Sequence, residues 1–147
     1  MTTTTEWLAQ AADDPRAAIA LWKENTTAPL VAGRQWDLVR LDFTLATAVI
    51  SHLKTRGRHI GPYVMGGVEH AMWWLIPLGG ARRVRRSPGV APYRKGAELF
   101  VPPPGRYLGE RVWVLPDADG ERRHTPTSDG ALREALGALV TGTAPPR

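Results

Sequence analysis

A run of apolar residues near the middle of the chain constrains the fold more than any other feature of the sequence. The segment Val68–Ile76 ends in Trp73-Trp74-Leu75-Ile76, where consecutive residues are all apolar. Consecutive side chains of a strand point to opposite faces of its sheet, so both faces of this strand are apolar. The run predicts a central strand. Tyr63–Met65 predicts its hairpin partner, because Gly66-Gly67 supplies the positive φ angles that a two-residue turn needs.

A helical period marks two further segments. Apolar residues and one histidine follow the spacing i, i+3, i+4, i+7 and i+8 at Leu45, Ala48, Val49, His52 and Leu53. This spacing predicts a helix over residues 44–56, and Gly57 follows its last turn. A second apolar stripe predicts a helix over residues 129–140.

The remaining elements are predicted from shorter signals. Thr3 and Glu6 form a capping box for a first short helix, and Asp14-Pro15 begins a second that runs to about Asn25. Residues 30–32 and 36–41 resemble two strands joined by the turn at 33–35. Further strands are expected at 97–101 and 111–115, separated by a stiff proline loop. Residues 79–96 are expected to form a mostly exposed basic connection.

These patterns predict one domain of the α+β or α/β class, in which helices cover a small mixed β-sheet. A chain of 147 residues is long enough to bury its own core. We divide it into an N-terminal helix pair at 1–28, an α/β domain at 29–141 and a frayed tail at 142–147.

Composition narrows the classes of function. The chain has no cysteine, which removes thiol chemistry and cysteine-bound metals and favours a cytoplasmic setting. The N-terminus does not resemble a signal peptide, and the longest apolar stretch is about half of a membrane span, so we expect no membrane partner. No cofactor motif and no histidine pair with metal-ligand spacing are present. Asp117 and Asp119 have the interval of a magnesium-binding pair, but Asp117-Ala118-Asp119-Gly120 is more typical of a polar turn.

The positive charge is concentrated in one segment. Of the 19 basic residues 16 are arginine, a skew that is expected of a GC-rich bacterial genome, and the formal net charge is +5. A strip without any acid contains Arg82, Arg83, Arg85, Arg86, Tyr93, Arg94 and Lys95. The strip is either a solvated connection or, with Arg106 and Arg111, a binding surface for nucleic acid or another polyanion.

Two other classes of function remain open. Glu69, His70 and His124 are weak acid/base candidates for a small enzyme that acts on an anionic metabolite. Alternatively, exposed Trp7, Trp22 or Trp36 would anchor a protein partner on a scaffold. Trp73, Trp74 and Trp113 lie on predicted strands and are expected in the core.

One segment resembles a known family. It reads Lys95-Gly96-Ala97-Glu98-Leu99-Phe100-Val101-Pro102-Pro103-Pro104-Gly105-Arg106-Tyr107, followed by Glu110-Arg111-Val112-Trp113-Val114. This pattern resembles the glycine, aromatic strand, Pro-Pro, polar loop and aromatic strand of the N-terminal domain of bifunctional DNA primase/polymerases, the prim-pol family. The order of elements from Leu30 to Leu139 is similar to short actinobacterial members of that family.

The resemblance implies a degenerate member. Active members carry two acids, separated by one residue, on a central strand, and this chain has Ile76 and Leu78 there. An apolar side chain cannot bind magnesium, so the resemblance implies no templated nucleotide addition. The sequence therefore favours a catalytically degenerate, primase/polymerase-like accessory or regulatory protein that binds nucleic acid.

Overall fold

Strand β4 (Ala71–Ile76) lies at the centre of a five-stranded sheet, as the apolar run predicts. The computed structural model describes residues 2–142. The strand order is β5-β2-β4-β3-β7, and every neighbouring pair is antiparallel. The other four strands are β2 (Asp37–Asp42), β3 (Tyr63–Gly66), β5 (Val90–Pro92) and β7 (Arg111–Val114).

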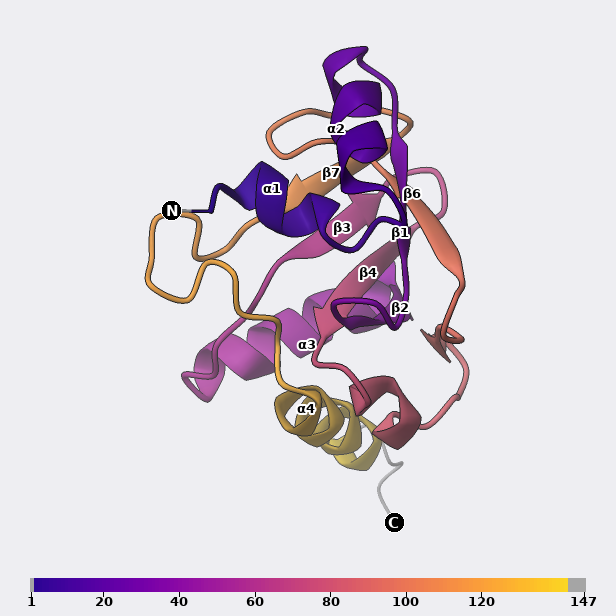
Figure 1. Cartoon of the computed structure of the whole chain (residues 1–147). Helices are drawn as coiled ribbons and strands as arrows, with labels where there is room; N and C mark the ends of the chain where they lie inside the picture. Colours follow the sequence, from indigo (N-terminus) through magenta and orange to yellow (C-terminus); the bar gives the residue numbers. More distant parts are fainter. Residues whose placement is uncertain (1, 143–147) are drawn as a thin grey trace.

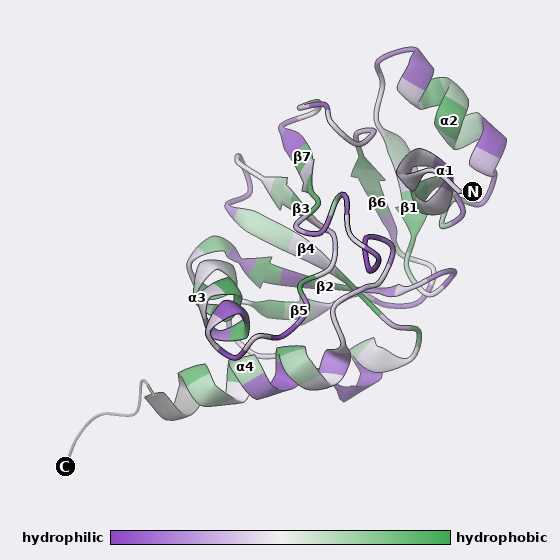
Figure 2. Cartoon of the chain, turned by 90° about the vertical axis from the view of Figure 1, so that its left-hand side faces the viewer, coloured by the Kyte–Doolittle hydropathy of each residue, from purple (hydrophilic) through white to green (hydrophobic). Residues whose placement is uncertain are grey.

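The sheet separates two apolar cores. On β4, Trp73 packs into one core and Trp74 into the other, and both are at most 2% exposed. On β2, Leu38 and Val39 alternate in the same way. The molecule therefore has a layer on each face of the sheet (Figure 2).

Two helices form the layer on the Trp74 side. Helix α3 (Phe43–Thr55) and helix α4 (Asp129–Gly142) confirm the two predicted helices, and their apolar stripes bury Val49, Leu53 and Leu132. Residues 143–147, most of the predicted tail, lie outside the described residues. No helix within residues 2–142 has the length and apolarity needed to cross a bilayer.

The layer on the Trp73 side combines helices and strands (Figure 1). It contains α1 (Thr4–Ala9), α2 (Pro15–Lys23), β1 (Ala28–Val31) and β6 (Glu98–Val101). The predicted capping box and the Asp14 cap are both present. The indole of Trp22 on α2 donates to the carbonyl of Val101 on β6 at 3.0 Å, a bond within this layer. The indole of Trp113 on β7 donates to the carbonyl of Pro102 at 2.8 Å, which ties the layer to the sheet.

The α+β class is confirmed, but β1 has a different partner from the one predicted. It pairs with β6 in a separate antiparallel sheet, with Leu30 opposite Leu99, and the turn at 33–35 leads from one sheet into the other. The amide of Ala32 extends this pairing by donating to the carbonyl of Ala97 at 2.9 Å. A local turn signal cannot reveal a partner that is about 70 residues away along the chain.

The predicted β3–β4 hairpin is present, but its turn is longer than the sequence indicated. Residues 67–70 form the turn, and Gly66 belongs to β3, opposite Ala71. A Cβ atom on Gly66 would lie 2.6 Å from the ring of Trp73. Gly66 is therefore required because an indole packs against its backbone, and not for the turn itself.

The segment 79–96 is more ordered and more buried than predicted. It contains the short 3₁₀ helix η1 (Gly80–Arg83) and the edge strand β5. Ala81, Val84 and Val90 are buried in the core on the Trp74 side, while the arginines between them stay exposed. Small apolar residues alternate with basic ones along the segment, so the apolar side chains are buried in the core while the arginines stay in contact with solvent.

The hydroxyl of Thr127 is a structural link between two loops. Thr127 is fully buried, and its Oγ1 accepts a hydrogen bond from the amide of Gly61 at 2.8 Å. We predict that Thr127→Val lowers the free energy of unfolding by about 1–3 kcal/mol, because it leaves that buried amide without an acceptor. Urea denaturation measures this, and Thr127→Ser, which keeps the hydroxyl, should cost less. Equal stability of the Val variant and the wild type would contradict the assignment.

Candidate anion-binding groove

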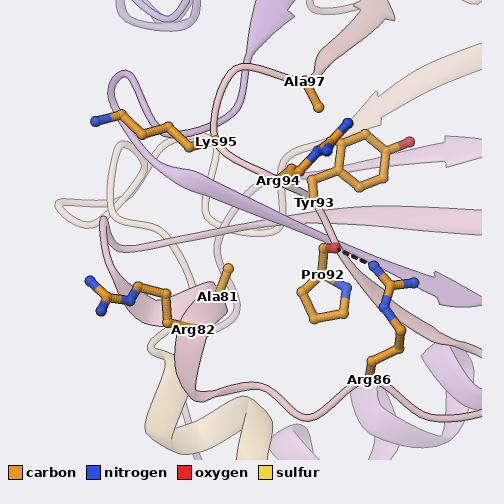
Figure 3. Close-up of a pocket in the computed structure, with 8 residues that line it drawn as sticks. All are labelled: Ala81, Arg82, Arg86, Pro92, Tyr93, Arg94, Lys95 and Ala97. Carbon is orange, nitrogen blue, oxygen red and sulfur yellow. Dashed lines mark hydrogen bonds between the residues drawn. The ribbon is translucent and has the colours of Figure 1, made fainter.

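Part of the predicted basic strip lines a shallow groove of about 620 Å³ beside the β5 edge of the sheet. Figure 3 shows the residues that line it, which are Ala81, Arg82, Arg86, Pro92, Tyr93, Arg94, Lys95 and Ala97. In this view Arg82 and Lys95 extend to the left, and Arg86 lies beside Pro92. We call this hollow the basic groove.

Backbone hydrogen bonds fix the two segments that form the basic groove. The amide of Ala81 donates to a carboxylate oxygen of Asp37 at 2.9 Å, which holds η1 against the start of β2. On the other side, the amides of Tyr93 and Gly96 donate to the carbonyls of Leu38 and Ala32, each at 2.8 Å. The sequence patterns did not predict this role of Asp37, and they did not predict β5. The short apolar run at residues 90–93 is the one signal that could have indicated this strand.

The cations of the basic groove are largely uncompensated. Within residues 2–142, the side chains of Arg82, Arg94 and Lys95 are exposed and form neither an ion pair nor a hydrogen bond. Arg86 donates only to the carbonyl of Pro92, at 3.1 Å. Among the described residues, no carboxylate lines the basic groove. Four positively charged residues therefore line one hollow, where they attract anions.

Tyr93 is held in place from the central strand. The indole Nε1 of Trp73 donates to the hydroxyl of Tyr93 at 2.9 Å. Because an indole is only a donor, the Tyr93 oxygen acts as the acceptor in this bond. The bond connects the basic groove directly to β4.

Two arginines of the strip lie elsewhere. Arg83 pairs with Asp129 on α4 at 3.8 Å, and Arg85 borders a separate hollow between α3 and α4. Of the four predicted arginines at 82–86, the structure brings only Arg82 and Arg86 into the basic groove.

Arg106 and Arg111 are also separate from the basic groove. Arg106 donates to the side chain of Asn25. Arg111 pairs with Glu69 at 2.8 Å, donates to the carbonyl of Phe100 at 2.6 Å and lies 4.4 Å above the Trp73 ring. Arg111 lies on β7, at the opposite edge of the sheet from β5, four strand spacings or roughly 19 Å away. Its contacts are those of a structural side chain.

The three acid/base candidates contact different parts of the chain. Partial burial opposes ionisation of Glu69, but its hydrogen bond to Arg111 and the Arg111 charge outweigh this and lower its pKa. His70 follows in the exposed turn, at a positive φ of 52°. His124 stacks on Trp7 at 4.9 Å and contacts Thr4 Oγ1 at 3.1 Å. The structure does not assemble the three residues around one reacting atom.

The tryptophans proposed as partner anchors are not exposed. Trp22 and Trp36 are core residues, 3% and 1% exposed. Trp7 is half-buried and packs 4.8 Å from Trp36. The interpretation of these residues as surface anchors is therefore wrong, because the layer of α1 and α2 uses them to cover the sheet.

The positions where the prim-pol resemblance would place acids lie at the end of β4. Ile76 is buried and Leu78 is 54% exposed. Within residues 2–142, no group of three or more His, Asp or Glu side chains is arranged to hold a metal ion.

The chain was compared with protein-family models, with curated proteins and with solved structures, and none of the three comparisons gives a match.

His124 gives a testable pH dependence. Burial, with a smaller contribution from the charge of Arg123, lowers the pKa of His124. The fold therefore favours the neutral ring. This contribution to stability is complete above the unfolded-state pKa of about 6.5 and is lost as the pH falls through the lowered folded-state pKa.

We predict that His124→Phe, which keeps an aromatic ring against Trp7 but cannot titrate, loses less stability on acidification than the wild type. Urea denaturation at about pH 7.5 and about pH 5.5, on either side of the histidine pKa, measures the difference. Identical losses in the two proteins would show that His124 does not carry this pH dependence.

Arg111 provides a contrast to the arginines of the basic groove. We predict that Arg111→Met lowers the free energy of unfolding by about 1–2 kcal/mol, because the contacts with Trp73 and Glu69 are lost. Anion binding by the folded protein should stay unchanged. Thermal denaturation measures the loss of stability, and a binding titration measures the affinity for the anion. Weaker anion binding by the variant would show that Arg111 belongs to the anion-binding site.

Proposed function

We propose that the basic groove binds nucleic acid through its phosphates, and that the chain is a catalytically degenerate, primase/polymerase-like accessory or regulatory protein. The observation that carries the proposal is a groove that four cationic side chains line and to which the part of the chain that the structure describes contributes no carboxylate. Phosphate contacts supply most of the affinity of proteins that bind nucleic acid without sequence preference. Arginine suits this task because its guanidinium stays charged and binds phosphate oxygens in pairs.

The shape of the surface favours an extended ligand over a small anion. The basic groove is shallow, and a second hollow of about 510 Å³ lies beside it. Lys95 lines both hollows, and the second is otherwise formed by Asp13, Gly96 and residues 31–34. In this second hollow Arg34 pairs with Asp13, so the unpaired charge is greatest in the basic groove. A polyanion can follow such a surface, whereas a small ion is better held in a closed site.

The groove favours contacts with phosphates over the reading of bases. Its cations lie on η1, in the segment between η1 and β5, and directly after β5, while α3 and α4 are packed on the sheet. Side chains from such segments contact the backbone of a nucleic acid and carry no sequence information. Tyr93, which Trp73 holds in place, offers an aromatic ring for a base in a single strand.

The test removes the three unpaired cations together. We predict that Arg82→Ser/Arg94→Ser/Lys95→Ser weakens binding of every oligonucleotide sequence to a similar extent. If each cation meets one phosphate, the slope of log affinity against log salt should become about 2 to 3 units less steep. Fluorescence anisotropy between about 50 and 200 mM NaCl measures the slope, with labelled single- and double-stranded oligonucleotides as probes.

A matched control removes the same charge elsewhere. Arg56, Arg122 and Lys54 are exposed, and none lines the basic groove. The variant Lys54→Ser/Arg56→Ser/Arg122→Ser therefore has the same net charge as the groove variant. If both variants lose affinity equally, net charge and not the groove attracts the nucleic acid. If the wild type does not bind at low salt, the proposed function is wrong.

A further inference from the structure

Another hollow, of about 440 Å³ and separate from the two described above, lies between α3, α4 and the segment 83–90. It is more enclosed than the basic groove, and most of the side chains along it are apolar. These are Leu45, Val84, Pro88, Val90 and Leu136. Gly137 of α4 contributes only backbone, which leaves room above the helix. We call this hollow the apolar slot.

Three arginines surround the apolar slot, namely Arg83, Arg85 and Arg133. Two of them share one carboxylate, since Arg83 and Arg133 lie 3.8 and 3.5 Å from Asp129. Arg85 is exposed and, within residues 2–142, its side chain forms no hydrogen bond or ion pair. The apolar slot therefore combines a largely apolar lining with an excess of positive charge at its edge.

We propose that the apolar slot binds a small amphiphilic acid, a medium-chain carboxylate whose alkyl tail lies along Val84, Val90 and Leu136 and whose carboxylate meets Arg85. The volume lies within the range of roughly 300–1,000 Å³ typical of small-molecule sites. The arginines complement a negative head group, and the apolar lining excludes a ligand that is charged along its whole length, such as a nucleic acid.

The apolar slot and the basic groove take different arginines from the same segment. Arg82 and Arg86 line the basic groove, while Arg83 and Arg85 border the apolar slot. The two binding activities can therefore be separated by substitution, and the carboxylate site does not depend on the proposed nucleic-acid function.

The first test uses a chain-length series of hexanoate, octanoate and decanoate, measured by isothermal titration calorimetry below micelle-forming concentrations. Affinity should rise about fourfold for each methylene buried, until the apolar slot is full. Decylamine should bind more weakly than decanoate because its charge is repelled by the arginines. Equal affinity for the acid and the amine, or no dependence on tail length, would overturn the proposal.

The second test fills the apolar slot from the helix. Among the described residues outside the backbone of α4 itself, no heavy atom lies within 4 Å of the position of a Cβ on Gly137, and the same holds for Gly130 on the same helix, which does not line the slot. Gly137→Leu should reduce decanoate affinity at least tenfold, and Gly130→Leu should leave it unchanged. Both should raise the melting temperature, because glycine is a poor helix former. Unchanged decanoate affinity in a folded Gly137→Leu variant would overturn the site.

The third test asks whether Arg85 is the residue that binds the carboxylate head group. Arg85→Ser should weaken decanoate about two- to fivefold, the range expected for an exposed ion pair, and should leave decanol binding unchanged. Neither Gly137→Leu nor Arg85→Ser should alter oligonucleotide binding beyond the loss of one charge. An equal effect of Arg85→Ser on decanoate and decanol would show that the carboxylate does not meet Arg85.

Discussion

The burial of β4 on both faces is the constraint on which the rest of the structure depends. Trp73 and Trp74 are adjacent, so they necessarily point into opposite cores, and each needs a complete layer to cover it. The helices α3 and α4 cover Trp74, which stacks on Tyr63 at 4.8 Å. On the other side, Trp73 packs against Gly66 and bonds to Tyr93. One strand therefore determines both the layering and the position of a residue in the basic groove.

The segment 80–95 combines structural and binding roles because its buried and exposed residues alternate. Ala81, Val84 and Val90 fasten it to the core, and the positions between them carry arginines that the core cannot accept. Since the segment lies at an edge of the sheet, these arginines project toward two different hollows. This one segment therefore borders both the basic groove, which suits phosphates, and the apolar slot, which suits an apolar tail with an acidic head group.

Local sequence patterns predicted where the helices and strands lie far better than they predicted which strands pair with one another. The cap at Asp14, the stripe of α3 and the central position of β4 depend on residues close together along the chain, and all three are confirmed. The pairing of β1 with β6 and the burial of Trp36 depend on residues that are far apart along the chain. The sequence shows where the basic residues are concentrated, but it could not show that Arg111 contacts Glu69 and Trp73 while Arg82, within residues 2–142, stays unpaired.

The sequence by itself determined which segments become helices or strands, which strand is central and where the positive charge is concentrated, because hydrophobic period, capping and charge are local properties of the chain. Only the tertiary structure decided which cations remain available for a ligand. Arg111 is paired with a carboxylate 42 residues away, and Arg83 shares one on α4 with Arg133, whereas no acid within residues 2–142 lines the basic groove. Charge compensation depends on distances in space, and those are set by how the layers pack on β4.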